Sequence, residues 1–373
     1  MNDTTTPRPP LSRIPPDIPC AQDYEALAAH FLPASHHAYI AGGSGFEATL
    51  RSNRDAFERV QILPRLLRDM TAGHTRLTLL GHELRHPILL APLAFQTLAH
   101  PQGELDTARA AAATDAGLVV STLSAWPLED IAACSRGEKW FQLYFQPLRD
   151  STLDLVRRAE AAGYGALVVT LDAVVQSPSL RAQRAGFCMP DAVRPGNLLH
   201  HATPPQVELE RGQSRIFQGL MREAPTWDDL DWLMRHTRLP VIVKGVLRAD
   251  DALALKAAGV AGIIVSNHGG RALDGVPASL DALPAVRAAV GADYPVLLDS
   301  GIRAGSDVFK ALALGADAVL VGRLQVFALA VAGALGVAHM LKLLREELEL
   351  CMALAGCATL REIMADCVTH RHA

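Results

Sequence analysis

The sequence predicts an α/β fold, a closed (β/α)8 barrel of the TIM-barrel class. From residue 87 onward, short apolar segments rich in β-branched residues alternate with helical patterns. Such alternation is typical of parallel strands joined by helices. There are eight of these apolar segments, which is the number that closes this barrel. The 373-residue chain is also long enough, since the fold takes roughly 250 residues.

The expected strands follow one another at an even spacing, apart from one long gap. They cover residues 87–94, 118–122, 139–145, 166–172, 240–246, 262–267, 295–301 and 318–323. Helical patterns lie between most of them, and several end in glycine, as helix C-termini often do. The clearest of these patterns are 103–117, 151–163, 249–259 and 305–316.

The long gap follows the fourth strand. Residues 173–225 are rich in Pro, Gly and charge, and we expect them to form a mobile loop over the active face. Residues 1–19 read as a flexible leader, and 20–373 as one domain. Within that domain we expect a mostly helical N-terminal cap at 20–86 and closing helices at 324–366.

Composition excludes several classes of function. The net charge of −4 and the absence of a basic block argue against nucleic-acid binding. Six cysteines without a CxxC pair favour reduced thiols in the cytoplasm over a disulfide framework or a zinc site. The histidine pairs lack a cysteine or carboxylate at ligand spacing, so we expect no metal.

No segment is expected to span a membrane. The leader has no apolar core like that of a signal peptide. The most apolar tract, 326–344, is interrupted by glycines, His339 and Lys342. It therefore reads as a buried helix pair rather than a span, which needs about 18 or more apolar residues.

Polar residues gather where the expected strands end, and the C-terminal face is where such barrels keep their chemistry. Lys244 stands out because it lies inside the apolar run VIVKGV, and a buried lysine is costly unless it is paired. The other residues at strand ends are Ala94, Ser124, Gln142, Tyr144, Thr170, Asp172, His268, Arg271, Asp299 to Arg303, Gly322 and Arg323.

Several of these segments carry a family resemblance. SNHGGRALDG (266–275), FQLYFQ (141–146), IVKGV (242–246) and the run from DSGIR to LVGR (299–323) resemble the FMN-dependent α-hydroxy acid oxidases and dehydrogenases. Members include glycolate oxidase, lactate oxidase and mandelate dehydrogenase. The resemblance extends from Tyr24 to Cys367. AGGSG (41–45) and LPRLLRD (63–69) are more similar to hydroxymandelate oxidase.

The resemblance implies FMN as cofactor and oxidation of an (S)-2-hydroxy acid to the 2-oxo acid, with flavin N5 receiving the electrons. It makes His268 the catalytic base, since imidazole titrates near working pH. Asp172 stabilises the resulting imidazolium. Lys244 lies beside the flavin and favours its reduced form. The remaining implied cofactor contacts are Ala94, Ser124, Gln142 and Thr170 around the ring, Gly301, Arg303, Gly322 and Arg323 at the phosphate, and Ser266 and Asp299.

The substrate side is implied in the same way. Arg271 and Tyr39 match the residues that bind the substrate carboxylate, for which a planar guanidinium is suited. Tyr144 matches the tyrosine near the substrate hydroxyl, with a catalytic role. Trp126 matches an aromatic residue of the pocket wall. The resemblance also implies a homotetramer.

One position departs from the family pattern. Relatives usually have a GRR-type run after the fourth strand, and its second arginine also binds the carboxylate. Counting from Asp172 to Phe187, this chain has Ser179 there. The loss of one charged hydrogen bond would weaken binding by roughly 1.5–3 kcal/mol. Three interpretations stay open: Arg181 replaces the arginine, the substrate carries an ester, an amide or a larger acid, or the protein has lost turnover.

Three functions therefore compete. The leading one is a 2-hydroxy acid oxidase or dehydrogenase, reoxidised by O2, a quinone or a carrier protein. Ala94, where dehydrogenases more often have glycine, favours an oxidase slightly. The second is a flavin-binding protein of the same fold without turnover. The third, another FMN-dependent barrel such as the isoprenoid isomerases, fits poorly with Tyr39, Tyr144 and His268.

Overall fold

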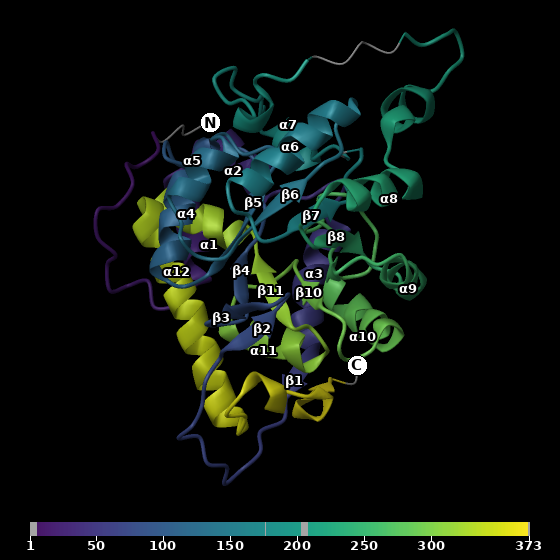
Figure 1. Cartoon of the computed structure of the whole chain (residues 1–373). Helices are drawn as coiled ribbons and strands as arrows, with labels where there is room; N and C mark the ends of the chain where they lie inside the picture. Colours follow the sequence, from purple (N-terminus) through teal and green to yellow (C-terminus); the bar gives the residue numbers. More distant parts are fainter. Residues whose placement is uncertain (1–5, 176, 203–207, 372–373) are drawn as a thin grey trace.

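The chain folds around a closed barrel of eight parallel strands, which confirms the predicted class (Figure 1). The computed structural model describes residues 6–175, 177–202 and 208–371. Each strand pairs with the next along the chain, and the last pairs with the first. The strands are β4 (Ile88–Leu90), β5 (Gly117–Ser121), β6 (Lys139–Leu143), β7 (Leu167–Thr170), β8 (Val241–Val246), β9 (Gly262–Val265), β10 (Val296–Leu298) and β11 (Ala318–Val321).

A helix follows every strand and covers the outside of the barrel (Figure 1). Local sequence fixes where some of them begin. Thr226 and Asp229, for example, form a capping box that satisfies free N–H groups at the start of α8. The helices are α4 (Glu104–Ala113), α5 (Leu128–Ala133), α6 (Arg149–Ala161), α8 (Trp227–His236), α9 (Ala249–Ala257), α10 (Ser279–Val290), α11 (Gly305–Ala313) and α12 (Arg323–Ala355).

The last of these helices is long and apolar enough to cross a membrane by length and composition alone. However, 78% of its most apolar 18-residue window is buried inside the protein. Its backbone leaves helical geometry at Ala332 and Gly333, so α12 consists of two helices joined by a kink. Both observations agree with the buried helix pair that the sequence predicts.

The barrel interior consists of an apolar layer below a polar one. Strand side chains alternate with a period of two, so residues two apart face the same side. The apolar layer contains Leu89, Val119, Trp140, Val168, Ile242, Ile264, Leu297 and Leu320. Two residues further along the same strands lie Ala91, Ser121, Gln142, Thr170, Lys244, Ser266, Asp299 and Gly322. The polar layer therefore lies at the C-terminal end of the barrel.

The N-terminal cap is helical only in its first part. Its elements are α1 (Asp23–Leu27), η1 (Ala28–His30), α2 (Ala34–Ala41) and α3 (Ala48–Arg59). The expectation of a mostly helical cap up to residue 86 does not hold beyond Arg59. There the chain forms β1 (Val60–Ile62), which pairs with β12 (Val368–His370), and a hairpin of β2 (Leu77–Leu79) and β3 (His82–Leu84).

That hairpin closes the lower end of the barrel, because Leu79 and Leu84 pack into the apolar layer of the interior. The described part of the leader, residues 6–19, contains no helix or strand. It nevertheless touches the body, since the Leu11 N–H donates to the Val331 carbonyl (2.8 Å) and Ile18 is buried. Residues 1–5 of the leader lie outside the described residues.

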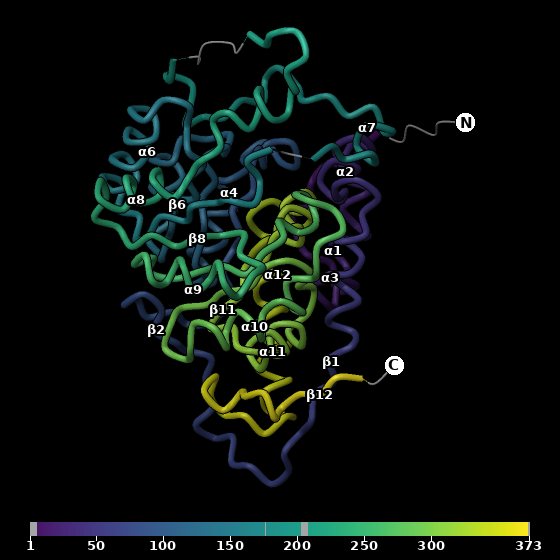
Figure 2. Tube along the Cα trace, turned by 90° about the vertical axis from the view of Figure 1, so that its right-hand side faces the viewer, coloured from purple at the N-terminus to yellow at the C-terminus, as the bar shows by residue number. Residues whose placement is uncertain are grey.

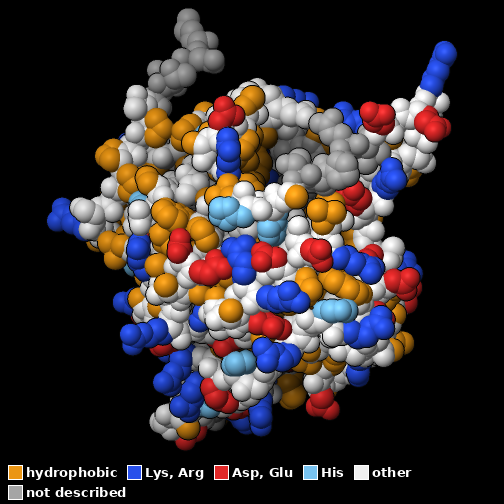
Figure 3. Space-filling model, turned by 45° about the horizontal axis from the view of Figure 1, so that its top comes forward, with side chains coloured by type: hydrophobic (Ala, Val, Ile, Leu, Met, Phe, Trp, Pro, Cys, Tyr) orange, Lys and Arg blue, Asp and Glu red, His pale blue; other side chains and the backbone are white. Residues whose placement is uncertain are grey.

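The insertion at 173–225 lies along the top of the molecule in Figures 1 and 2. Its residues 176 and 203–207 lie outside the described part. The rest contains four short helices: α7 (Leu180–Arg184), η3 (Gly196–Leu198), η4 (Arg215–Gly219) and η5 (Leu220–Glu223). Seen from above, this end of the molecule has a hollow in its surface, bordered by hydrophobic side chains (Figure 3).

Asn197 anchors the insertion to the barrel. Its amide nitrogen donates to the Ser121 and Thr122 carbonyls and to the Ser124 hydroxyl, and its amide oxygen accepts from the Leu128 N–H. Arg158 of α6 donates to the Asn197 carbonyl, and His201 contacts Asp154 of the same helix (2.9 Å). These contacts fix the loop that follows β5.

Candidate active site

A cavity of about 490 Å³ opens at the C-terminal end of the barrel. Most of the predicted site residues line it: Tyr39, Ala94, Tyr144, Thr170, Lys244, His268, Arg271, Asp299, Gly301, Arg303, Gly322 and Arg323. The structure thus brings together residues that are almost 300 positions apart in the sequence. Their common origin is the parallel barrel, whose strand ends all meet on one face.

His268 and Asp172 form a hydrogen-bonded pair at the cavity wall. His268 Nδ1 lies 2.9 Å from Asp172 Oδ1, and the His268 side chain is 24% exposed against 10% for Asp172. Nδ1 is thereby engaged, which leaves Nε2 as the nitrogen available to a substrate. Although burial raises the pKa of Asp172, Lys244 and His268 outweigh it and lower that pKa to about 2. The carboxylate is therefore charged at working pH.

Lys244 is buried beneath this pair among acidic and hydroxyl groups. Its Nζ lies 2.9 Å from Ser266 Oγ, 3.4 Å from Asp299 Oδ2 and 3.9 Å from Asp172 Oδ2. Burial lowers the pKa of Lys244, but Asp172 and Asp299 outweigh it, so this pKa lies above the ordinary lysine value. The pairing that a buried lysine requires is present.

The loop that carries His268 has an unusual backbone. His268, Gly269 and Gly270 have φ angles of 58°, 64° and 72°, a conformation that is costly for a residue with a side chain. The two glycines also allow close approach. A Cβ at Gly270 would lie 2.7 Å from the Leu50 nitrogen, and one at Gly269 would lie 2.7 Å from Arg323 Nη1.

Arg271 and Tyr39 form the predicted carboxylate site. The Arg271 guanidinium carbon lies 4.8 Å from the centre of the Tyr39 ring, and Nη1 donates to the Tyr39 and Gly42 carbonyls. Within the described part of the chain, Nε and Nη2 of Arg271 have no hydrogen-bond partner and remain available. Tyr144 also lines the cavity, and burial raises its pKa to about 12, so its hydroxyl stays a donor.

The polar layer contains buried hydrogen-bonding groups that a ligand in the cavity could satisfy. Among the described residues, Gln142 Nε2 and Thr170 Oγ1 are buried without a partner, which is uncommon in native proteins. A Cβ at Gly322 would meet no atom closer than 4.0 Å, so open space lies above it. A planar polar ring such as isoalloxazine fits these groups, since Gln142 Nε2 can donate to it and Thr170 Oγ1 can donate or accept. Gln142 Oε1 already accepts from Ser121 and Thr122.

Cationic groups lie at one end of the cavity, where the phosphate of FMN is expected. Burial, with Arg271 and Arg303 nearby, lowers the pKa of Arg323 to about 9. Its guanidinium donates to the carbonyls of Ile40, Gly269 and Gly42. Such a buried cation is stabilised by an anion. Arg303 is paired with Glu25 in the present arrangement (2.6 Å).

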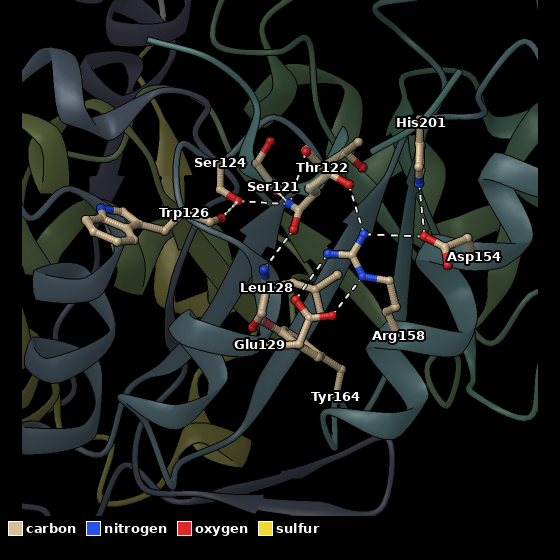
Figure 4. Close-up of polar contacts among 11 residues, drawn as sticks. Ser121, Thr122, Ser124, Trp126, Leu128, Glu129, Asp154, Arg158, Tyr164 and His201 are labelled. Atoms are coloured by element: carbon tan, nitrogen blue, oxygen red, sulfur yellow. Dashed lines mark hydrogen bonds and ion pairs between the residues drawn. The ribbon is translucent and has the colours of Figure 1, made fainter. Parts of the chain in front are cut away.

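Six predicted residues lie outside the cavity lining: Ser124, Trp126, Gln142, Asp172, Arg181 and Ser266. The Ser124 hydroxyl donates to the Trp126 carbonyl and accepts from Asn197, so it holds the loop and does not face the cavity. Trp126 packs against the hydrophobic core beside this loop (Figure 4). Ser121 and Leu123 line the cavity instead. The strand period would have found Ser121, because it lies two residues after the interior residue Val119.

Neither Ser179 nor Arg181 of the insertion lines the active-site cavity. Ser179 Oγ accepts from the Ala182 N–H (3.3 Å) and so caps the N-terminus of α7. The Arg181 guanidinium is paired with Glu47 instead of pointing into the cavity lining. Of the two arginines Arg181 and Arg271, Arg271 is the one that lines the cavity. Sequence reasoning also missed Leu220 and Glu223 of the insertion, which line the cavity from η5.

Comparison with known proteins agrees with this geometry. The family model for FMN-dependent dehydrogenases matches residues 28–370. An L-lactate oxidase of Alicycliphilus denitrificans is 62% identical over 96% of this chain and 99% of its own length. A 4-hydroxymandelate oxidase of Amycolatopsis orientalis is 45% identical over 90% of this chain and 94% of its own.

A solved structure is also similar over nearly the whole chain. The crystal structure of mandelate oxidase with (S)-2-phenylpropionate has a TM-score of 0.85 and 42% identity, and the match covers 95% of this chain and 98% of that one. The family, the fold and the cofactor that the resemblance implied are therefore confirmed. The chain is an oxidoreductase that belongs to the FMN-dependent dehydrogenase family, together with the 2-hydroxy acid oxidases.

Proposed function

We propose that the chain oxidises an (S)-2-hydroxy acid to the 2-oxo acid, with L-lactate as the leading substrate and O2 as the electron acceptor. The observation that carries this proposal is the His268–Asp172 pair at 2.9 Å, set in the same cavity as Arg271, Tyr39 and Lys244. L-Lactate is favoured because the relative at 62% identity is named L-lactate oxidase. The names of the relatives likewise favour O2 over a quinone or a carrier protein.

The chain's own residues divide the work of substrate binding and proton transfer. Arg271 and Tyr39 bind the carboxylate and orient the substrate. His268 Nε2 accepts the proton that leaves as C2 is oxidised, and the Asp172 carboxylate stabilises the imidazolium so formed. Tyr144 donates a hydrogen bond toward the substrate hydroxyl. FMN, when bound, supplies the two-electron acceptor.

Gln142, Thr170, Ser121 and the backbone near Ala94 would hold the flavin ring, with Gly301, Gly322, Arg303 and Arg323 at its phosphate. Lys244 would then supply a buried positive charge beside the ring, where it would favour negative charge on the cofactor. Because Asp299 and Asp172 hold the Lys244 ammonium in place, this charge is fixed before the reaction begins.

The test is an anaerobic visible spectrum of the FMN-loaded protein. We expect (S)-lactate to bleach the flavin band, and admission of air to restore it with formation of hydrogen peroxide. Glycolate and (S)-mandelate serve as competing substrates, and (R)-lactate as the stereochemical control. A flavin that stays oxidised with every 2-hydroxy acid contradicts the proposal, and bleaching without recovery in air points to a quinone or protein acceptor.

A second function stays in view because of Ser179: a flavin-binding protein of this fold without turnover. It is supported by the loss of one substrate arginine and by the pairing of Arg181 with Glu47. It predicts a yellow protein that no 2-hydroxy acid bleaches, and a Ser179→Arg variant that gains activity. The leading proposal predicts instead that Ser179→Arg changes KM in an enzyme that is already active.

A further inference from the structure

A second cavity adjoins the active-site cavity. It has a volume of about 230 Å³, and Tyr39 and Arg271 line both cavities. We call this second cavity the side chamber. Its other walls come from the AGGSG segment and from the first part of the insertion, and include Ser44, Ser177, Ser179, Gln183 and Phe187.

Tyr39 and Arg271 lie at the border of the two cavities, and Phe187 extends their stack along the side chamber. The Phe187 ring lies 4.2 Å from the Tyr39 ring at an angle of 11°, and the Arg271 guanidinium lies 4.8 Å from the same ring. His36 meets the edge of Phe187 (5.8 Å). Aromatic and cation–π contacts of this kind fix the orientation of each ring. The side chamber therefore has a defined boundary beside the carboxylate site.

The side chamber is nearly neutral. Arg271 is the one charged side chain among its described lining residues. Ser44 Oγ donates to the Gly270 carbonyl and Ser179 Oγ caps α7, so both hydroxyls are partly engaged. Arg181 does not line the side chamber, because its guanidinium is paired with Glu47, which also accepts from the Gly43 N–H.

This arrangement weakens the usual preference for a charged carboxylate. A hydrogen bond to an ionised group is about twice as strong as one between neutral groups, so every cation at the site favours the acid over its neutral derivatives. Here Arg271 is the cation at the shared wall, and its Nη1 is engaged with two backbone carbonyls. Its remaining N–H groups can bind the carbonyl oxygen of an ester or amide as well.

We propose that the side chamber is a subsite for a substituent on the C1 carboxyl group, so that the chain also oxidises esters and amides of (S)-2-hydroxy acids. This inference rests on the proposed function. The volume of about 230 Å³ is several times the roughly 30 Å³ that one water occupies, and it accommodates a short alkyl group. The balanced reaction converts the 2-hydroxy ester and O2 to the 2-oxo ester and hydrogen peroxide.

The experiment compares ethyl (S)-lactate, (S)-lactamide and (S)-lactate with the FMN-loaded protein. We expect kcat/KM for the two derivatives to lie within about tenfold of the value for the acid, since the site discriminates little between them. Peroxide is measured together with the 2-oxo ester by mass spectrometry, so that prior hydrolysis to the acid is recognised.

Two variants fill the side chamber from different walls. Ser179→Asn adds volume and keeps a residue that can cap α7, and Ser177→Leu adds volume from the neighbouring segment. Each should lower kcat/KM for the ester about tenfold relative to the acid, because overpacking a small cavity is unfavourable. Ser214→Asn is the matched control, since Ser214 caps η4 in the same insertion but lines neither cavity, and asparagine can keep the cap.

The outcomes separate the two proposals. Oxidation of (S)-lactate without oxidation of the ester and amide overturns the subsite and leaves the proposed function standing. The subsite is also overturned if both filled variants keep the ester-to-acid ratio of the parent protein. Failure to oxidise any of the three compounds contradicts the proposed function itself, and the subsite with it.

Discussion

The two sides of the active-site cavity are built differently. On the barrel side, Lys244, Thr170 and Asp299 come from strands or strand ends whose backbones are hydrogen-bonded to neighbours on both sides. On the insertion side, the lining comes from short helices and loops, among them Leu220 and Glu223 of η5. Those segments are held by a few side chains such as Asn197 and by the pairing of Arg181 with Glu47.

This difference indicates which side carries out the reaction and which side selects the substrate. Proton transfer needs groups held within a fraction of an ångström, which strands provide better than loops. Substrate choice needs a wall that differs between relatives, and the insertion provides it. We therefore expect changes to the barrel-side proton-transfer pair, His268 and Asp172, to alter rate constants, and changes on the insertion side to alter the preference among substrates.

The largest effect is expected for His268→Gln. Loss of the base should lower the limiting rate of flavin reduction by about 10²-fold to 10⁴-fold, while FMN stays bound because the polar layer is unchanged. Anaerobic stopped-flow spectroscopy measures this rate. His201→Gln is the control, since His201 contacts Asp154 of α6, lies outside the cavity lining and should leave the rate unchanged. Equal rates for His268→Gln and the parent protein would remove His268 as the base.

Arg271→Lys should act mainly on binding. The lysine keeps the charge but lacks the planar fork, so loss of one charged hydrogen bond should raise KM for (S)-lactate by about tenfold to 100-fold. Steady-state peroxide formation measures this change. Arg248→Lys on the exposed surface is the control. A fall in kcat with an unchanged KM would assign Arg271 to the chemical step instead.

Asp172 should link stability to pH. Its pKa in the folded protein is about 2, below the ordinary 3.8. The contribution of the ionised Asp172 to the free energy of unfolding is therefore nearly complete above pH 4, and it disappears as the pH falls toward 2. The full contribution is roughly 2 kcal/mol, and about half of it is lost at pH 3. Urea unfolding at pH 5, 4 and 3 should show a shallower decline in Asp172→Asn than in the parent protein. Parallel declines would mean that Asp172 is not paired in the folded state.

The smallest expected effect is on FMN affinity, and it should differ between Ser121→Ala and Ser124→Ala. Ser121→Ala should weaken FMN binding several-fold, as expected for the loss of about 1 kcal/mol of hydrogen bonding. Ser124→Ala should leave FMN affinity unchanged and lower stability, because Asn197 loses an acceptor. Fluorescence titration of FMN and thermal unfolding give the two readings. Weaker FMN binding in Ser124→Ala alone would restore Ser124 as the cofactor residue.

Much of the fold and of the barrel side could be predicted from the sequence. Apolar runs and helical patterns carry a period, so all eight strands are found in order, and the residues of the polar layer follow from counting by two. Lys244 could be recognised because it lies within an apolar strand segment, and His268 because it precedes two glycines directly after a strand.

The remaining features depend on loop conformation, which has no period. Ser124 and Trp126 lie three and five residues beyond the end of β5, where Asn197 determines the path of the chain. The positions of Leu220 and Arg181 depend on contacts between segments far apart in sequence. The same holds for residues 60–86, where β1 pairs with β12 from the other end of the chain. A cytoplasmic location and a homotetramer stay predictions.

The most direct test of this division is the limiting rate of flavin reduction by (S)-lactate, measured without oxygen in the parent protein, His268→Gln and Ser179→Asn. We predict that His268→Gln loses at least about 10²-fold. Ser179→Asn should keep the parent's limiting rate and change only the lactate concentration at which it is reached. An equal loss of limiting rate in both variants would contradict the assignment of chemistry to the barrel and of selectivity to the insertion.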